Sequence, residues 1–173
     1  RSDVEAAVLR EAQRLNKRRN PGPLRMWDIH LYHLTGIALS RQDARAADLC
    51  HALAVYLQLS GKYAEAQSYF EQALVIRRRV LGGAHPDTAS ALHCLGALFG
   101  DMNKPDEAQN CLEQALLIRE QVAEPDFLEI AESLSVLGNV LLAAGKLPRA
   151  QPCLERALAL YKQHLGADHA QTA

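Results

Sequence analysis

The stretch Phe70-Glu71-Gln72-Ala73-Leu74 decides the fold, because close copies of it recur at a fixed distance along the chain. The string LEQAL begins at Leu112 and LERAL begins at Leu154, so each copy lies 42 residues after the one before. Other positions keep the same spacing: Ala47, Ala89, Ala131 and Ala173; Leu53, Leu95 and Leu137; Ala54, Gly96 and Gly138; Ala66, Ala108 and Ala150. Three repeats align without insertion or deletion, which predicts an array of stacked units.

Each repeat predicts a pair of helices. Apolar residues recur at steps of three and four, which places them on one face of a helix. The predicted first helices cover residues 44–59, 87–101 and 128–144, and the predicted second helices cover 63–81, 105–122 and 147–165. Gly61, Asn103 and Gly145 lie in the short breaks, where a left-handed residue closes a helix.

Small residues indicate where the two helices of a pair cross. Ala54, Gly96 and Gly138 lie midway along the three first helices. Helix axes approach to about 8 Å only where the side chains between them are small. We therefore expect each of these positions to face the second helix of its own pair.

The junctions between repeats carry helix-start signals. The sequences that begin at Asp126 and Asp168 resemble a capping box, with aspartate as the cap and Glu129 or Gln171 three residues later. At the first junction Pro86 suits the first turn of a helix, and no side-chain cap is expected there.

Composition excludes several classes of protein. The chain has 173 residues, 49% hydrophobic and 23% charged, with a net charge of −1, which argues against disorder and against a general nucleic-acid binder. No apolar run approaches the roughly 18 residues of a membrane helix. The first residue is Arg1, which we interpret as the start of an excised piece of a longer protein. The four cysteines, Cys50, Cys94, Cys111 and Cys153, are expected to be reduced thiols in a cytoplasmic setting.

The repeat resembles a known family. The strings GKYAEA from Gly61 and FEQAL from Phe70 are similar to the tetratricopeptide repeat, or TPR, over residues 44–173. The 42-residue length and the junctions Leu81-Gly82-Gly83-Ala84-His85-Pro86 and Leu165-Gly166-Ala167-Asp168-His169 resemble the kinesin light chain type. The middle junction departs from that pattern, because Phe127 replaces the histidine.

The resemblance implies an all-α fold, a right-handed superhelical solenoid of antiparallel helix pairs. It divides the chain into TPR 1 at 44–86, TPR 2 at 87–128, and TPR 3 with the first residues of a further repeat at 129–173. Residues 1–43 match less well. A helix from Ala6 to Arg19, the break Asn20-Pro21-Gly22-Pro23 and an apolar stripe from Leu24 through Trp27 to Ala38 predict a divergent helical pair. This pair is a cap or a degenerate repeat; the alternative is a helical tail of a preceding domain.

No catalytic motif is present, so we expect no enzyme, no cofactor and no metal site. His30 and His33 lie one turn apart, but no third ligand stands at a suitable spacing. The run Arg77-Arg78-Arg79 suits the C-terminal end of a helix, where cations interact favourably with the helix dipole.

The family implies a concave groove lined by first helices, which binds a peptide. The residues expected to line it are Asp48, His51, Val55 and Gln58 in TPR 1, Ser90, His93 and Ala97 in TPR 2, and Glu132, Ser135 and Asn139 in TPR 3. Asn139 is the expected contact to a peptide backbone, because an amide both donates and accepts. The two histidines are expected to gain charge on acidification, from an ordinary pKa near 6.5.

Two functions remain open at this point. The first is a non-catalytic scaffold that binds a protein or peptide partner, neutral to basic because the groove carries acids and no cations. The second is a structural segment that packs on other domains of a larger signalling or NTPase-containing protein, or self-associates through its C-terminal end. Neither a nucleic acid nor a membrane is an expected partner.

Overall fold

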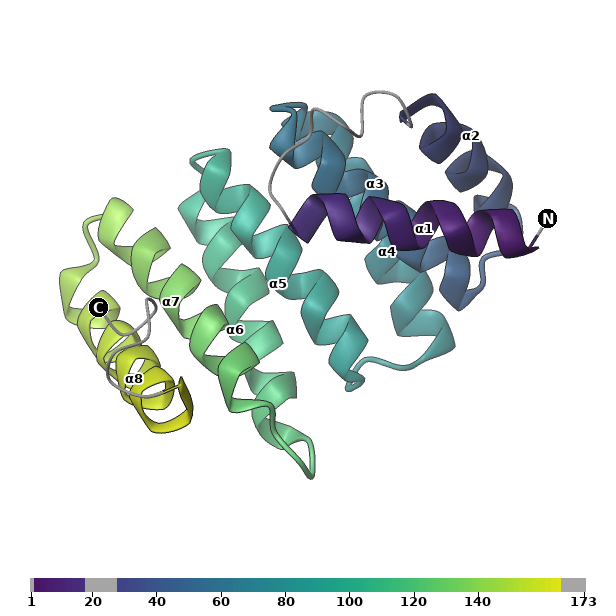
Figure 1. Ribbon diagram of the computed structural model, residues 1–173. Helices are drawn as coiled ribbons and strands as arrows, with labels where there is room; N and C mark the ends of the chain where they lie inside the picture. Colours follow the sequence, from purple (N-terminus) through teal and green to yellow (C-terminus); the bar gives the residue numbers. More distant parts are fainter. Residues whose placement is uncertain (1, 18–27, 166–173) are drawn as a thin grey trace. The chain divides into compact units, whose positions relative to one another are not determined.

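The computed structural model describes residues 2–17 and 28–165, which form eight helices and contain no strand (Figure 1). The helices are α1 Ser2–Lys17, α2 Asp28–Leu39, α3 Ala44–Leu59, α4 Tyr63–Val80, α5 Pro86–Asp101, α6 Pro105–Gln121, α7 Phe127–Ala143 and α8 Leu147–Leu165. The six helices from α3 onward agree with the predicted ranges to within one residue at each end. The all-α fold of paired helices is therefore confirmed.

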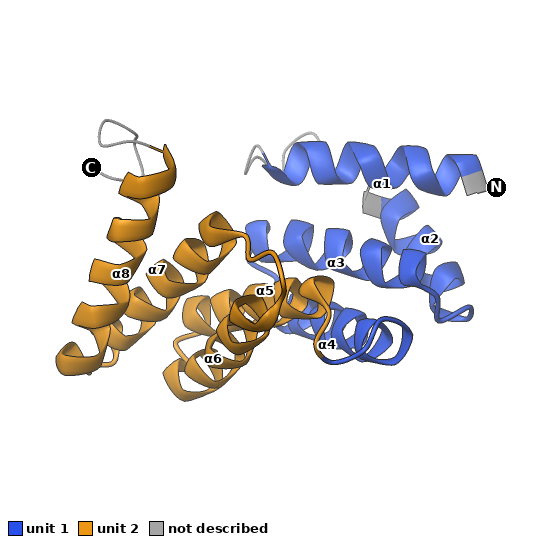
Figure 2. Ribbon diagram, turned by 90° about the horizontal axis from the view of Figure 1, so that it is seen from below, with its two compact units in different colours: residues 1–83 blue, residues 84–173 orange. Residues whose placement is uncertain are grey.

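The chain divides into two compact units, and each is described by itself (Figure 2). Unit 1, residues 1–83, contains α1 to α4, and unit 2, residues 84–173, contains α5 to α8. Within unit 2 the second helix α6 packs against its own first helix α5 and against the following first helix α7. Stacking of successive pairs thus buries the apolar faces that one pair cannot bury alone.

The turn inside each repeat has the expected left-handed residue. Gly61, Asn103 and Gly145 have φ values of +75°, +55° and +71°, and they are spaced exactly one repeat apart. Glycine adopts this conformation without a steric penalty, and asparagine tolerates it better than most residues. The chain can therefore reverse direction within a few residues and bring the second helix back along the first.

The helix starts confirm one expectation and correct another. Asp126 caps α7, because its Oδ1 accepts hydrogen bonds from the backbone N–H groups of Leu128 at 2.9 Å and Glu129 at 3.2 Å. The expectation of no side-chain cap on α5 was wrong. The Nδ1 of His85 accepts a hydrogen bond from the backbone N–H of Asp87 at 3.1 Å, so a histidine replaces the more usual aspartate.

The small residues lie at the helix crossings as predicted. A methyl group built on Gly96 would lie 2.7 Å from Cγ of Leu112, and one built on Gly138 would lie 2.6 Å from Cγ of Leu154. Both leucines belong to the second helix of the same pair. Glycine is required here by close packing and not by backbone conformation.

The N-terminal helices keep the frame of the repeat although the sequence motif is lost. Helix α1 starts and ends exactly 42 residues before α3, and the buried Val8, Ala12 and Leu15 precede the buried Cys50, Ala54 and Leu57 by the same distance. Helices α1 and α2 both pack on α3 but contact each other little. Each of the two N-terminal helices is thus held mainly by α3 and less by the other.

Several predicted features fall outside the described residues. These are the Asn20-Pro21-Gly22-Pro23 break, Leu24, Trp27, the junction residues from Gly166 to His169, the Asp168 cap and the start of a further helix at 170–173.

Candidate functional site

The first helices of unit 2 place five of the predicted site residues at equivalent positions. Ser90 and Ala97 on α5 correspond to Glu132 and Asn139 on α7, one repeat later, and Ser135 lies between the last two. Glu132 and Asn139 are exposed, and the other three are half-buried. Asn139 comes seven residues after Glu132, which is nearly two full helical turns, so both side chains leave α7 on the same side. We call the exposed side that carries these residues the first-helix face.

The polar groups of this face differ in how they are satisfied. The Ser90 hydroxyl donates to the backbone carbonyl of Pro86 at 3.2 Å, and Ser135 hydrogen-bonds to the Tyr161 hydroxyl. The Asn139 amide makes no hydrogen bond to any part of the chain that the structure describes, so both its donor and its acceptor are available to a ligand.

His93, predicted to line the groove, lies inside the protein instead. Only 9% of it is exposed, and its Nδ1 lies 3.0 Å from the Ser133 hydroxyl. The Ser133 oxygen also accepts a hydrogen bond from Nη1 of Arg119, which donates in turn to the Glu129 backbone carbonyl at 2.8 Å. Arginine only donates, so the serine proton points to Nδ1 and the proton of a neutral His93 is on Nε2.

The surroundings of His93 keep it neutral. Burial, and then the positive charge of Arg119, lower its pKa to about 4. The expectation that this histidine gains charge near pH 6.5 was therefore wrong. Sequence reasoning placed His93 by its repeat position alone and gave no signal that Arg119 and Ser133 converge on it.

The four predicted site residues of unit 1 lie on α3. Asp48 accepts a hydrogen bond from Nη2 of Arg77 at 3.1 Å, and the ring of His51 packs edge-on against Phe70 with centroids 5.5 Å apart. Val55 and Gln58 are half-buried. Arg77 is itself buried, and with Arg78 and Arg79 it lies in the last turn of α4, where the basic run was predicted to lie.

The cations of unit 2 lie mostly on the second helices. Arg149 and Arg156 on α8 pair with Glu113 and Glu120 on α6, at 2.8 and 2.7 Å. Lys146, just before α8, pairs with Asp106 at 2.8 Å. Helices α5 and α7 contain no lysine or arginine, whereas they contain four acids: Asp87, Asp101, Glu129 and Glu132. The first helices of the unit thus carry only acidic charge, whereas the second helices carry charges of both signs.

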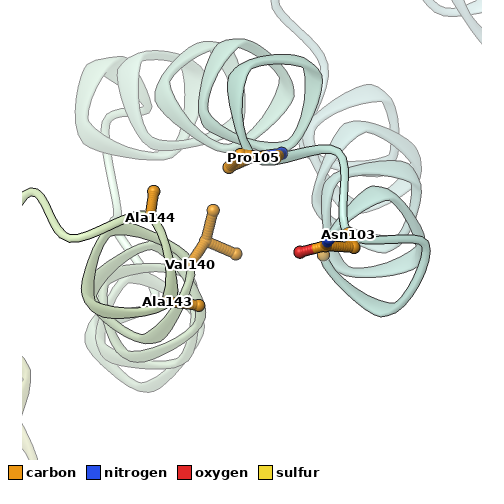
Figure 3. Close-up of a pocket in the computed structure, with 6 residues that line it drawn as sticks. Asn103, Pro105, Val140, Ala143 and Ala144 are labelled. Carbon is orange, nitrogen blue, oxygen red and sulfur yellow. The ribbon is translucent and has the colours of Figure 1, made fainter.

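A small pocket lies where α5 ends, α6 begins and α7 ends (Figure 3). It measures about 30 Å³ and is lined by Gly100, Asn103, Pro105, Val140, Ala143 and Ala144. A methyl group on Gly100 would come within 3.1 Å of Val140, so the missing side chain of this glycine keeps the pocket open. The volume suits one water or a methyl-sized group. Sequence analysis missed it, because a hollow between three helix ends leaves no local motif.

The described residues contain no group of three or more His, Cys, Asp or Glu side chains that could hold a metal ion. The four cysteines are free, and burial raises the pKa of Cys50 to about 12, which makes it unreactive.

None of the described helices is both long and apolar enough to span a membrane.

Comparisons with known proteins agree with the helix-pair architecture. Models of the tetratricopeptide repeat match residues 45–121 and 130–171. The structure is similar to BtubC (BKLC) from P. vanneervenii, with 28% identity and a TM-score of 0.68 over 72% of this chain and 50% of BtubC. The chain thus spans half the length of BtubC. A comparison of the sequence with curated proteins found no match.

Two further solved structures show the same fold at lower identity. A putative kinesin light chain from Podosopora anserina with nearly identical TPR-like repeats has 21% identity and a TM-score of 0.78, over 96% of this chain and 79% of the other. MamA protein has 14% identity and a TM-score of 0.56, over 98% and 89%.

Proposed function

Because the chain belongs to the tetratricopeptide repeat family, of the kinesin light chain type, we propose that its first-helix face binds an extended segment of a protein partner. The family and its structural neighbours make the chain a protein–protein interaction scaffold. The proposal adds the place and the form of the ligand. Four free thiols suit a reducing compartment, and we propose the cytoplasm as the place where it acts.

The observation that carries the proposal is Asn139. Its exposed amide has no partner within the described residues, and it lies on α7 in line with Glu132. A primary amide can accept from a backbone N–H and donate to the next carbonyl, which holds an extended chain regardless of its side chains. Because α5 and α7 carry acids and no lysine or arginine, we infer a partner segment that is neutral or basic.

A display selection tests the proposal without a known partner. A library of random dodecapeptides is selected on the 173-residue chain, and the enriched peptides are measured against variants by fluorescence anisotropy. Asn139→Ala should weaken binding by about 2- to 10-fold, the equivalent of one or two hydrogen bonds.

Asn110→Ala is the matched control, because Asn110 is an exposed asparagine on the second helix α6 of the same unit. It should leave the affinity unchanged. Equal losses in both variants, or a loss only in the control, would contradict binding at the first-helix face.

One observation favours a second function, self-association through α8. Leu158 is 38% exposed, whereas Leu116, at the same position of the preceding repeat, is 8% exposed. Leu147 on the same helix is 61% exposed, so apolar surface gathers there. Sedimentation equilibrium over a range of concentrations tests this function. A dimer that Leu158→Ser abolishes would support it, and a monomer at every concentration would contradict it.

A further inference from the structure

Two carboxylates at equivalent positions of different repeats have different neighbours. Asp48 in repeat 1 is paired with Arg77, which lies 29 residues later on the second helix of its own repeat, with Nη2 and Oδ1 3.1 Å apart. In repeat 3 the equivalent acid is Glu132, and the residue 29 positions later is Tyr161. A neutral phenol therefore stands where repeat 1 has a guanidinium.

Tyr161 cannot supply the missing charge. It is buried, and its pKa is raised by burial and further by the Glu132 carboxylate, so the phenol stays protonated and neutral at physiological pH. Its hydroxyl is already hydrogen-bonded to Ser135. Glu132 thus has a polar neighbour but no compensating positive charge on its own helix pair.

The arginine of repeat 2 is committed elsewhere. Its first helix carries Ser90 at the Asp48 position, and Arg119, at the Arg77 position, turns instead to the next first helix. There it meets the Ser133 hydroxyl and the Glu129 carboxylate, with Nε and Oε2 3.2 Å apart. Lys146, Arg149 and Arg156 pair with acids of α6, and no ion pair with Glu132 occurs among the described residues.

We propose that Glu132 binds an arginine side chain of the partner segment, which supplies the charge that Arg77 supplies to Asp48. The inference rests on the proposed function, because it assumes a ligand on the first-helix face. An exposed carboxylate accepts two parallel N–H groups from a guanidinium, so arginine is preferred to lysine, which offers only a point charge.

The pocket at Gly100 adds a second requirement for the partner segment and sets its distance from the arginine. Ala143 on its wall lies eleven residues after Glu132 and within about 20° of the same line along α7, which corresponds to roughly 16 Å. A strand advances about 3.3 Å per residue, so four or five residues of extended ligand reach from one to the other. The partner segment then carries a small aliphatic side chain about five residues from its arginine.

The dodecapeptide selection described above also tests this inference. Arginine should be enriched, with alanine or valine about five positions away. Replacing that arginine by citrulline, which keeps the shape and removes the charge, should weaken binding about tenfold. Glu132→Gln should weaken the arginine peptide by a similar factor and leave the citrulline peptide unchanged. Glu107→Gln, which makes the same charge change on the exposed side of α6, should have no effect.

A second variant imitates repeat 1. Tyr161→Arg supplies an internal cation to Glu132, so it should weaken the arginine peptide and reduce the dependence of binding on salt. Because this residue is buried, the helical content and melting temperature of the variant are compared with those of Tyr161→Phe, which keeps the ring and should bind normally. If Tyr161→Arg fails to fold, the inference is tested by the affinities of Glu132→Gln for the arginine peptide and for its citrulline counterpart.

The outcomes separate the two proposals. If enriched peptides lack arginine but lose affinity in Asn139→Ala, the first-helix face binds a partner and the role of Glu132 is wrong. If the citrulline penalty persists in Glu132→Gln, another carboxylate holds the arginine and the inference is overturned. If no peptide is enriched, or if Asn139→Ala leaves the affinity of the enriched peptides unchanged, the proposed function itself is contradicted.

Discussion

The N-terminal helix pair and repeat 2 share one frame but hold their helices by different chemistry. Repeat 2 has the buried Ala89 on its first helix, and the position 84 residues earlier is Glu5, which is also buried. The Glu5 carboxylate accepts two hydrogen bonds from Arg41, at 3.0 and 2.9 Å. An ion pair between α1 and the turn before α3 thus replaces a methyl group.

This difference shows which features the helical fold requires and which belong only to the FEQAL motif. The helices of the N-terminal pair occupy the repeat frame without the FEQAL string, so that string is not required for the helices to form. Repeat 2 uses close crossing of α5 on α6, whereas α1 relies on α3 and on Arg41 for its position. We expect substitutions to affect the two regions by different mechanisms and by different amounts.

The largest expected effect is the loss of the guanidinium beside Glu5. Arg41→Ala removes both guanidinium hydrogen bonds from a carboxylate that is only 3% exposed. Losing this charge partner at a buried carboxylate costs about 3 kcal/mol of unfolding free energy. Amide hydrogen exchange of α1 and urea unfolding measure this loss.

The double variant Glu5→Ala, Arg41→Ala converts the site to the chemistry of repeat 2 and serves as the control. It should recover most of the stability, because neither charge then remains. If the double variant is as unstable as Arg41→Ala alone, packing and not charge holds α1.

The next effect compares one substitution at two glycines. Gly96→Ala places a methyl group 2.7 Å from Cγ of Leu112 and 3.2 Å from the Ala108 carbonyl oxygen, so the crossing must open, at about 2 kcal/mol. Gly36→Ala in α2 meets no atom within 4 Å and should stabilise the chain by about 0.5–1 kcal/mol through helix propensity.

Thermal unfolding of the two alanine variants measures both changes in stability. A loss in the first and a gain in the second would show that glycine is needed for packing in repeat 2 and not in the N-terminal pair. A gain in both would mean that Leu112 moves aside at little cost, and that the predicted close crossing is not essential.

Much of this architecture was predictable from the sequence, because it follows from the repeat. The spacing fixed the helix ranges from residue 44 onward, and the crossings at Gly96 and Gly138 followed from residue size. The N-terminal helices matched the repeat less well because Glu11 and Asp28 stand where repeat 1 has Leu53 and Phe70, although Ala12 and Leu15 keep the residue types of Ala54 and Leu57. Glu5 in particular looks like a surface residue until the three-dimensional structure brings Arg41 to it.

The helix that carries each candidate site residue was predictable, but the surroundings of the residue were less so. Repeat position placed Glu132, Ser135 and Asn139 correctly on one helix. Repeat position could not show that His93 is buried beside Arg119. The exposure of this side chain depends on residues that lie 26 and 40 positions away along the chain. The pocket at Gly100 was not predicted for the same reason, because it is formed by three helix ends that are separate in the sequence.

A third prediction uses pH to sharpen the comparison, because His93 of repeat 2 is held neutral by its surroundings. Its folded pKa is about 4, and the unfolded value is about 6.5. Between these values the unfolded chain binds more protons, so the contribution of His93 to stability is full above pH 6.5 and is lost as the pH falls to about 4. At pH 5.5 the loss is about 1 kcal/mol.

The variant His93→Gln keeps a polar group beside Ser133 and should remove this slope. Urea unfolding of unit 2 at several pH values between 4 and 7 measures it. The pKa of Asp106 is lowered by its hydrogen bond to Lys146, so this carboxylate loses its contribution only below its ordinary value of 3.8, outside the window. An identical slope in both chains would mean that His93 is not the group responsible.

The smallest expected effect concerns the ion pairs between the second helices of unit 2. Arg156 and Glu120 are both partly exposed, and water screens their attraction. Arg156→Ala should therefore cost only about 0.2–1 kcal/mol, and less at high salt. The double variant with Glu120→Ala measures the coupling between the two residues by thermal unfolding at low and high salt. Charge then stabilises the two regions in different ways: mainly by one buried ion pair at the N-terminal helices, and by three exposed ion pairs along α6 and α8. A coupling energy between Arg156 and Glu120 as large as the effect at Glu5 would contradict this distinction. The exposed ion pairs would then have the structural role that we assign to the close helix crossing at Gly96.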